Sequence, residues 1–274
     1  MIAMISIQSG ASIAKGLFVE MGPAGVTALR VFFSAIILVI IANPMRHKKT
    51  FKHILTDRKQ LGLIAAYGLS LGLMNLFFYF SLERIPLGLA VTLEFAGPLA
   101  VSILYSRKWI DVLWVILAAL GIGILFFHSG EMKIDLIGML LALVAAFFWA
   151  LYIIFGKKAT RNDHGSLIVA SLGMCFAAMV ALPSGLFINT QQVINPNYWL
   201  AGLGVAILSS AVPYSLELKA MKSIPEKTFG ILMSFEPVVA TTVGFIFLKE
   251  SLDLTQIGAM SLVIIACVGS SYES

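Results

Sequence analysis

Charged residues are scarce in this chain: Asp, Glu, Lys and Arg make up 12% of its 274 residues, whereas hydrophobic residues make up 59%. Soluble domains carry about 25% charged residues. A single water-facing globule could not bury so much apolar surface, so the composition predicts an all-α integral membrane protein in contact with a lipid bilayer. The net charge of +5 comes without an aromatic-rich basic patch, so we expect no nucleic-acid partner.

Residues that bind metals or form covalent links are also few. The two cysteines, Cys175 and Cys267, lie far apart in apolar segments, which favours two buried thiols over a disulfide. The HExxH, GxSxG and Walker A motifs are absent, and the four histidines are scattered. We therefore expect no enzyme activity, no cofactor and no metal site. Residues 1–18 lack the basic start and small-residue cleavage site of a signal peptide, so we expect no cleavable leader.

Long apolar runs take the place of these features. Each is long enough, or nearly so, for a hydrocarbon core of about 30 Å, so the chain is predicted to cross the membrane ten times. The predicted spans are 1–20, 24–43, 60–82, 86–106, 111–128, 136–155, 166–187, 199–218, 227–248 and 254–272. The first run already begins at residue 1, so we expect the start of its helix to be missing from the chain. Residues 44–59 are predicted to form a basic loop.

The Lys and Arg residues predict the orientation. With ten spans, fourteen of the nineteen fall in loops on the side of the termini and three on the other side. Since basic loops stay cytoplasmic, both termini are predicted to be cytoplasmic. The remaining two, Lys15 and Arg30, fall inside predicted helices.

Two segments resemble each other at an offset of 139 positions. Residues 85–98 read IPLGLAVTLEFAGP and residues 224–237 read IPEKTFGILMSFEP, so each begins with Ile-Pro and ends with Pro. We therefore predict two five-helix repeats, residues 1–131 and 132–274. Because five is odd, the second repeat must be inverted. Inverted repeats are typical of transporters, with the substrate site in a central cavity between the halves.

Two carboxylates fall deep inside these predicted spans, Glu94 and Glu236. They lie eight and nine residues into their segments, so roughly 12 Å from the membrane edge at the rise of a helix. An ionisable side chain at that depth costs several kcal/mol unless it faces a wet cavity or a partner. We favour substrate binding for Glu94. A local structural role is an equal alternative for Glu236, which directly precedes Pro237.

Other polar side chains share helix faces. Gln8, Ser12 and Lys15 form one stripe, which suits a cavity lining, although Lys15 could instead reach the headgroups. Arg30 lies deeper and is interpreted as an ion-pair partner. Aromatic and polar pairs at helical spacing complete the candidate substrate site, with membrane packing as the alternative for each. These are Asn75 with Tyr79, Trp149 with Tyr152, and Ser210 with Tyr214, the last pair beside Pro213.

Several stretches resemble the EamA family of the drug/metabolite transporter superfamily, and more narrowly the bacterial inner-membrane threonine/homoserine exporters. They are SIQSGASIAKGLF (6–18), GVTALR (25–30), PLGLAVTLEFAGPLAV (86–101), AILSSAVPYSLEL (206–218) and FGILMSFEPVVA (229–240). The resemblance covers essentially the whole chain. It implies an inverted-repeat bundle in the bacterial inner membrane that exports small amino acids.

Two functions follow from these observations. The first is export of a zwitterionic amino acid by alternating access, with Glu94 binding the ammonium and Lys15 or a helix N-terminus binding the carboxylate. Proton antiport through Glu94 is an additional hypothesis. The second is a broader exporter of aromatic or cationic compounds, suggested by cation–π contacts with Trp149, Tyr152 and Tyr214. A membrane scaffold that transports nothing would need neither the repeat nor the polar stripes.

Overall fold

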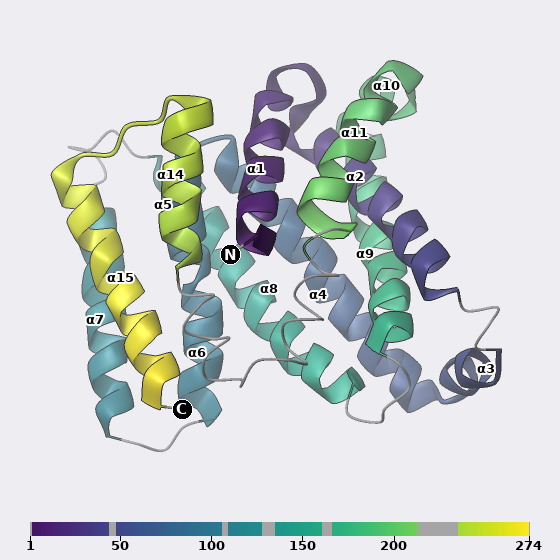
Figure 1. Ribbon diagram of the computed structural model, residues 1–274, viewed down its shortest axis with the longest axis horizontal. Helices are drawn as coiled ribbons and strands as arrows, with labels where there is room; N and C mark the ends of the chain where they lie inside the picture. Colours follow the sequence, from purple (N-terminus) through teal and green to yellow (C-terminus); the bar gives the residue numbers. More distant parts are fainter. Residues whose placement is uncertain are drawn as a thin grey trace.

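The computed structural model describes residues 2–43, 48–105, 109–127, 135–160, 166–211, 213 and 235–273, and these residues form helices and no strand (Figure 1). The helices of the first half are α1 Ile2–Gly16, α2 Phe18–Ala42, α3 Lys48–Thr56, α4 Arg58–Leu82, α5 Leu87–Glu94, α6 Ala96–Tyr105 and α7 Ile110–Phe127. Those of the second half are α8 Leu136–Thr160, α9 Ser166–Ile188, α10 Thr190–Ile194, α11 Trp199–Ala206, the π-helical turn η2 Ile207–Ala211, α14 Glu236–Leu248 and α15 Leu254–Glu273. A 3₁₀ turn, η1 Pro196–Tyr198, precedes α11.

Four of the described helices are long and apolar enough to cross a membrane by themselves. They are Phe18–Ala42, Arg58–Leu82, Leu136–Thr160 and Leu167–Ile188. Shorter apolar helices lie at Leu87–Val101, Val112–Leu125, Glu236–Leu248 and Leu254–Gly269. The all-helical membrane class predicted from the composition is therefore confirmed, whereas the count of ten spans stays a prediction.

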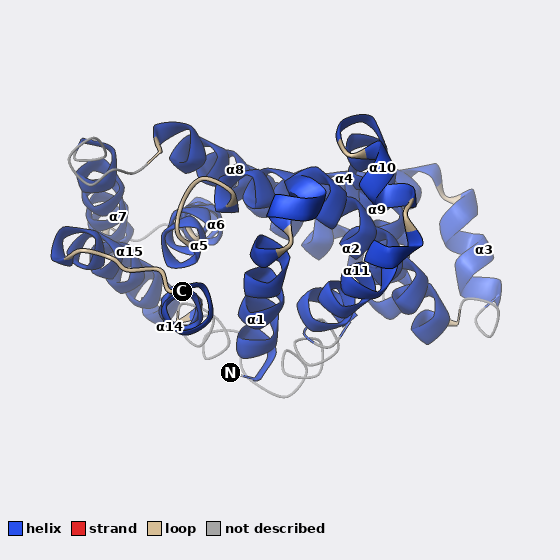
Figure 2. Ribbon diagram, turned by 90° about the horizontal axis from the view of Figure 1, so that it is seen from above, coloured by secondary structure: helices blue, strands red, loops and turns tan. Residues whose placement is uncertain are grey.

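The helices form a bundle in which α1 lies between α14 on one side and α11 with η2 on the other (Figures 1 and 2). Helices α7 and α15 lie side by side at one end of the molecule, and α3 lies at the opposite end. Between them, α4 packs against both α8 and α9, and α2 packs against α9. The centre of the bundle is therefore built from segments far apart in the sequence.

Two predicted boundaries were wrong. The first helix was expected to run to residue 20, but α1 ends at Gly16 and the next turn belongs to α2, which is kinked at Gly22 (φ 65°) just before Pro23. Glycine adopts this left-handed conformation without steric cost. The basic segment 44–59 was expected to be a loop, but it contains α3. Ile54 of α3 is fully buried against Ile64, so an apolar contact holds the short helix to α4.

Aspartates begin two helices next to the loops. Asp57 accepts hydrogen bonds from the backbone N–H groups of Lys59 and Gln60 at the start of α4. Asp135 accepts from Ile137 and Gly138 at the start of α8 and pairs with Arg84 at 2.9 Å. The Gly138 N–H and the Arg84 side chain hold the pKa of the exposed Asp135 carboxyl below its ordinary value. Such caps satisfy the free backbone donors of a helix start.

Close approach of α4 and α9 depends on glycine. A methyl group at Gly68 would meet the carbonyl oxygen of Gly173 and the Cβ of Phe176. We therefore expect Gly68→Ala to lower the free energy of unfolding by about 1–3 kcal/mol through overpacking. Gly62→Ala is the matched control in the same helix, because its methyl group would meet nothing within 4 Å. Thermal unfolding of both variants in detergent checks this; equal melting temperatures would contradict the described crossing.

Helix interruption coincides with the buried glutamate at Glu94. Helix α5 ends at this residue, Phe95 follows with φ −63° and ψ −14°, and α6 begins at Ala96. Pro98 has no N–H, so it cannot donate the i→i−4 hydrogen bond to the carbonyl of Glu94. The break between α5 and α6 therefore leaves the Glu94 carbonyl without its usual helical donor, close to the Glu94 carboxylate.

Candidate functional site

The polar stripe predicted on α1 faces α14. The Gln8 amide donates a hydrogen bond of 2.9 Å to the Glu236 carboxylate, and both residues are buried. Glu236 is the first residue of α14, with Pro237 following in the first turn, where the missing N–H costs no helical hydrogen bond. The N-terminal dipole of the helix also favours a carboxylate there. Ser12, one turn further along α1, is buried as well.

Glu94 and Arg30 complete a buried charge cluster. Glu94 and Arg30 are each 7% exposed and Glu236 is 5% exposed. The Glu94 carboxylate is repelled by Glu236 and attracted by Arg30. Two carboxylates and one guanidinium leave a net negative charge among these described side chains when all three are ionised. Such a site favours a proton or an organic cation as its fourth charge.

Arg30 is positioned by the π-helical turn η2 and by an aromatic ring. Its Nη2 donates to the carbonyl of Ser209 at 3.4 Å, and its guanidinium carbon lies 5.1 Å from the centre of the Tyr79 ring. The Ser209 carbonyl lies four residues before Pro213, which has no N–H to donate to it. The side chain was predicted to form an ion pair. Among the described residues it instead contacts a ring and a released carbonyl, while its attraction to Glu94 acts at longer range.

Several polar atoms around this cluster have no hydrogen-bond partner in the described part of the chain. Since an unmade hydrogen bond on a buried group costs about 1–3 kcal/mol, four such atoms on members of the cluster or on residues that contact them point to a ligand or water. They are Gln8 Oε1, Arg30 Nε, Tyr79 Oη and Ser209 Oγ. Helix α1 also approaches η2 closely, since a methyl group at Gly10 would meet Ser209 Oγ.

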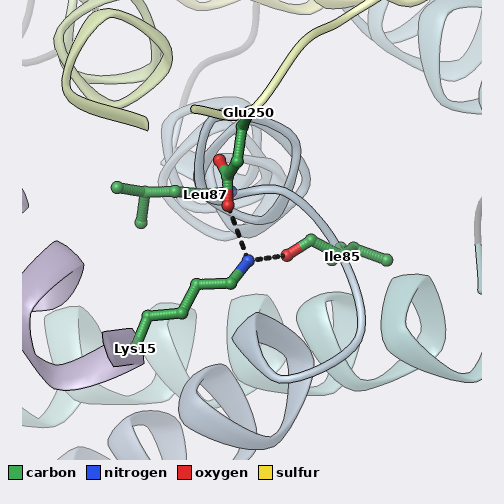
Figure 3. A network of polar contacts seen from close by, with 4 residues as sticks. All are labelled: Lys15, Ile85, Leu87 and Glu250. Atoms are coloured by element: carbon green, nitrogen blue, oxygen red, sulfur yellow. Dashed lines mark hydrogen bonds and ion pairs between the residues drawn. The ribbon is translucent and has the colours of Figure 1, made fainter. Parts of the chain in front are cut away.

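Lys15 lies apart from this cluster, at the C-terminal end of α1. Its Nζ is 2.7 Å from Glu250 Oε1 and donates to the carbonyl of Ile85, also at 2.7 Å (Figure 3). The other oxygen of Glu250 accepts from the N–H of Leu87, the first residue of α5, at 2.8 Å. One lysine and one glutamate thus join α1, the start of α5 and the segment that follows α14.

This network should be energetically coupled. The two side chains are 21% and 14% exposed, so the pair is less screened than a surface ion pair. We expect a double-mutant cycle with Lys15→Met and Glu250→Gln to give a coupling energy of about 1 kcal/mol or more in thermal unfolding. Additive effects of the two substitutions would show that the pair contributes nothing to stability.

The remaining predicted site residues are placed as follows. Trp149 packs edge-on against Phe95, next to Glu94, with ring centres 5.0 Å apart. Tyr152 stacks on Tyr67 at 5.0 Å. The Asn75 amide donates to the carbonyl of Leu71 in its own helix. Tyr214 lies outside the described residues.

Sequence reasoning missed two residues of this region. Ser209 carries no charge, and only its position four residues before Pro213 marks its carbonyl as available. Glu250 lies between two predicted spans, and no local pattern connects it to Lys15, 235 positions away. Within the described ranges, no group of three or more His, Cys, Asp or Glu side chains could hold a metal ion.

Comparison with known proteins decides the family. Residues 136–272 match the EamA-like transporter family, and two enterobacterial relatives match almost the whole chain. The relative from Salmonella typhimurium LT2 is 44% identical over 272 residues, covering 99% of this chain and 89% of its own length. The chain belongs to the EamA-like transporter family. The Salmonella relative is named threonine/homoserine exporter RhtA, as is the relative from Escherichia coli K12, which is 43% identical with the same coverage.

More distant proteins also match the chain. An uncharacterised transporter of Clostridium kluyveri is 26% identical over 260 residues, covering 90% of this chain and 83% of its own length. A crystal structure of another protein shares the fold, with a TM-score of 0.60 at 18% identity over 98% of this chain and 92% of that chain. The resemblance predicted from the sequence motifs is confirmed. A transporter family, not an enzyme family, contains this chain.

Proposed function

We propose that this EamA-like protein exports small zwitterionic amino acids such as threonine and homoserine across the bacterial inner membrane by alternating access. The observation that carries the proposal is the buried cluster of Glu94, Glu236 and Arg30, because a zwitterion needs opposite charges a few ångströms apart in a water-poor site. The names of the two enterobacterial relatives support the substrate class. In this proposal the ammonium of the amino acid lies between the two carboxylates.

The proposal includes ten spans arranged as two inverted repeats, residues 1–131 and 132–274, around a central cavity. Equivalent helices of such repeats should pack in pairs across a pseudo-two-fold axis. Three pairings support this: α2 with α9, α5 with α14, and α7 with α15. In the proposed repeats α4 corresponds to α11 with η2, and α8 corresponds to α1. The contact of α4 with α8 therefore has a counterpart in the contact of α11 and η2 with α1. The three charged residues of the cluster come from both halves, as a site between repeats requires.

The proposed orientation places both termini in the cytoplasm. The distribution of Lys and Arg is its main support. The predicted outer connections also meet one another, which supports their lying on one face of the bundle. Arg84 pairs with Asp135, and Lys15 joins the segment before α5 to Glu250 after α14.

Efflux of radiolabelled threonine from preloaded proteoliposomes tests the function. We expect saturable efflux that is inhibited by homoserine and only weakly by aromatic or purely cationic compounds, because these cannot supply a carboxylate. Inhibition by a panel of organic cations with no effect of homoserine would favour the broader exporter. Absence of threonine efflux would contradict the proposal.

A further inference from the structure

We infer that Arg30, with the hydroxyl groups of Tyr79 and Ser209, binds the carboxylate of the transported amino acid and makes the site select zwitterions. This inference rests on the proposed function and assigns the half of the substrate that the two glutamates cannot bind. Lys15 was the predicted carboxylate partner, but its ammonium already contacts Glu250 and the Ile85 carbonyl, both at 2.7 Å. Arg30 is the described basic side chain that interacts with Glu94.

Arg30 has donors to spare. A guanidinium carries five N–H donors in a planar fork that matches a carboxylate. The hydrogen bond recorded for Arg30 among the described residues uses one of them, at the long distance of 3.4 Å to the Ser209 carbonyl, and Nε is buried without a partner there. Its head is nonetheless held in place, because it lies 5.1 Å over the Tyr79 ring. A fixed guanidinium with unused donors is suited to receive an anion.

Two residues that contact Arg30 carry buried hydroxyl groups that also lack a partner among the described residues. Tyr79 is fully buried, its ring is packed against Phe18 with centres 5.5 Å apart, and its Oη has no partner in the described ranges. Ser209, whose carbonyl already contacts Arg30, has a buried Oγ that likewise lacks one. Both hydroxyls can donate a hydrogen bond to a carboxylate oxygen. The three unused donor groups come from α2, α4 and η2, so they converge by tertiary structure and not by sequence proximity.

The arrangement assigns one role to each end of the substrate. The carboxylate lies on Arg30, Tyr79 and Ser209. The ammonium lies on the side of Glu94 and Glu236, where Gln8 holds the second glutamate. An analogue without the carboxylate would leave the buried donors unpaired, and binding sites built to hydrogen-bond a group reject analogues that lack it. The site should therefore prefer threonine to threoninamide, which keeps the ammonium and the side chain.

Tyr79→Phe is the sharpest test, because it removes a hydroxyl that makes no hydrogen bond within the described chain and should not unfold the protein. The measurement is inhibition of labelled-threonine counterflow in proteoliposomes by unlabelled threonine and by threoninamide. We expect Tyr79→Phe to weaken inhibition by unlabelled threonine about tenfold or more and to leave inhibition by threoninamide unchanged. Arg30→Lys, which keeps the charge and loses the fork, should act in the same direction and more strongly. Tyr198→Phe is the matched control and should change neither.

The outcomes separate the two proposals. Suppose that the parent protein exports threonine and that Tyr79→Phe and Arg30→Lys keep its melting temperature. If these variants then bind threonine as tightly as the parent, or bind threonine and threoninamide more weakly by the same factor, the carboxylate assignment is overturned and the proposed function stands. If the parent protein moves no threonine, the proposed function fails and this inference fails with it.

Discussion

Glu94→Gln is expected to reduce threonine efflux from proteoliposomes by at least about 30-fold while leaving the protein folded. The substitution keeps the size and shape of the side chain but removes the charge that we assign to the substrate ammonium. Removing one partner of a buried charge pair costs about 2–5 kcal/mol, and each 1.4 kcal/mol is tenfold in affinity. Repulsion from Glu236 also disappears in the variant, so its thermal stability should be equal to or above that of the parent.

The matched control for this prediction is Glu20→Gln. Glu20 lies in the first turn of α2 and is exposed, so the same chemical change there should leave efflux unaltered. If Glu94→Gln is folded and exports threonine as fast as the parent, the carboxylate has a structural role, such as bonding a backbone donor near Pro98. The ammonium site would then have to be sought around Glu236.

A pH gradient should drive threonine accumulation. Two repelling carboxylates in one buried site favour a bound proton when no ammonium is present, so substrate and proton should exclude each other. When one proton is exchanged for one zwitterion and the membrane potential is clamped at zero, net transport stops once the concentration ratio of threonine equals that of protons. Vesicles one pH unit more acidic inside should therefore concentrate threonine about tenfold, since one pH unit is about 1.4 kcal/mol.

This accumulation should disappear in Glu94→Gln, because the variant retains no pair of competing carboxylates. The control is the same vesicles with the gradient collapsed by a protonophore. Threonine distribution that ignores an imposed pH gradient in the parent protein would contradict proton antiport while leaving facilitated export possible.

The helices could be predicted well from the sequence because apolar runs of membrane length have few alternative structures. The failures were local. The basic composition of residues 44–59 did not show that they contain a short helix with Ile54 buried, because that burial depends on partners elsewhere in the bundle. The kink at Gly22 was missed because a Gly-Pro pair can either end a helix or bend it.

The candidate site was predictable where an unusual residue type signalled it. A carboxylate or guanidinium inside an apolar run is costly, so Glu94, Glu236 and Arg30 could be singled out without a structure. Which of them meet could not be predicted, because the contacts join distant segments: Gln8 to Glu236, and Lys15 to Glu250. The second contact matters most, since it removes Lys15 from the binding role that its helix face suggested and leaves Arg30 as the cation of the cluster.

Equilibrium binding of radiolabelled threonine to the purified protein, compared with Glu94→Gln and Glu20→Gln, tests the central claim most directly, because it isolates the buried charge cluster from coupling and orientation. We predict one saturable site in the parent and in Glu20→Gln, and its loss in Glu94→Gln. Equal binding by all three proteins would contradict a zwitterion site at these carboxylates.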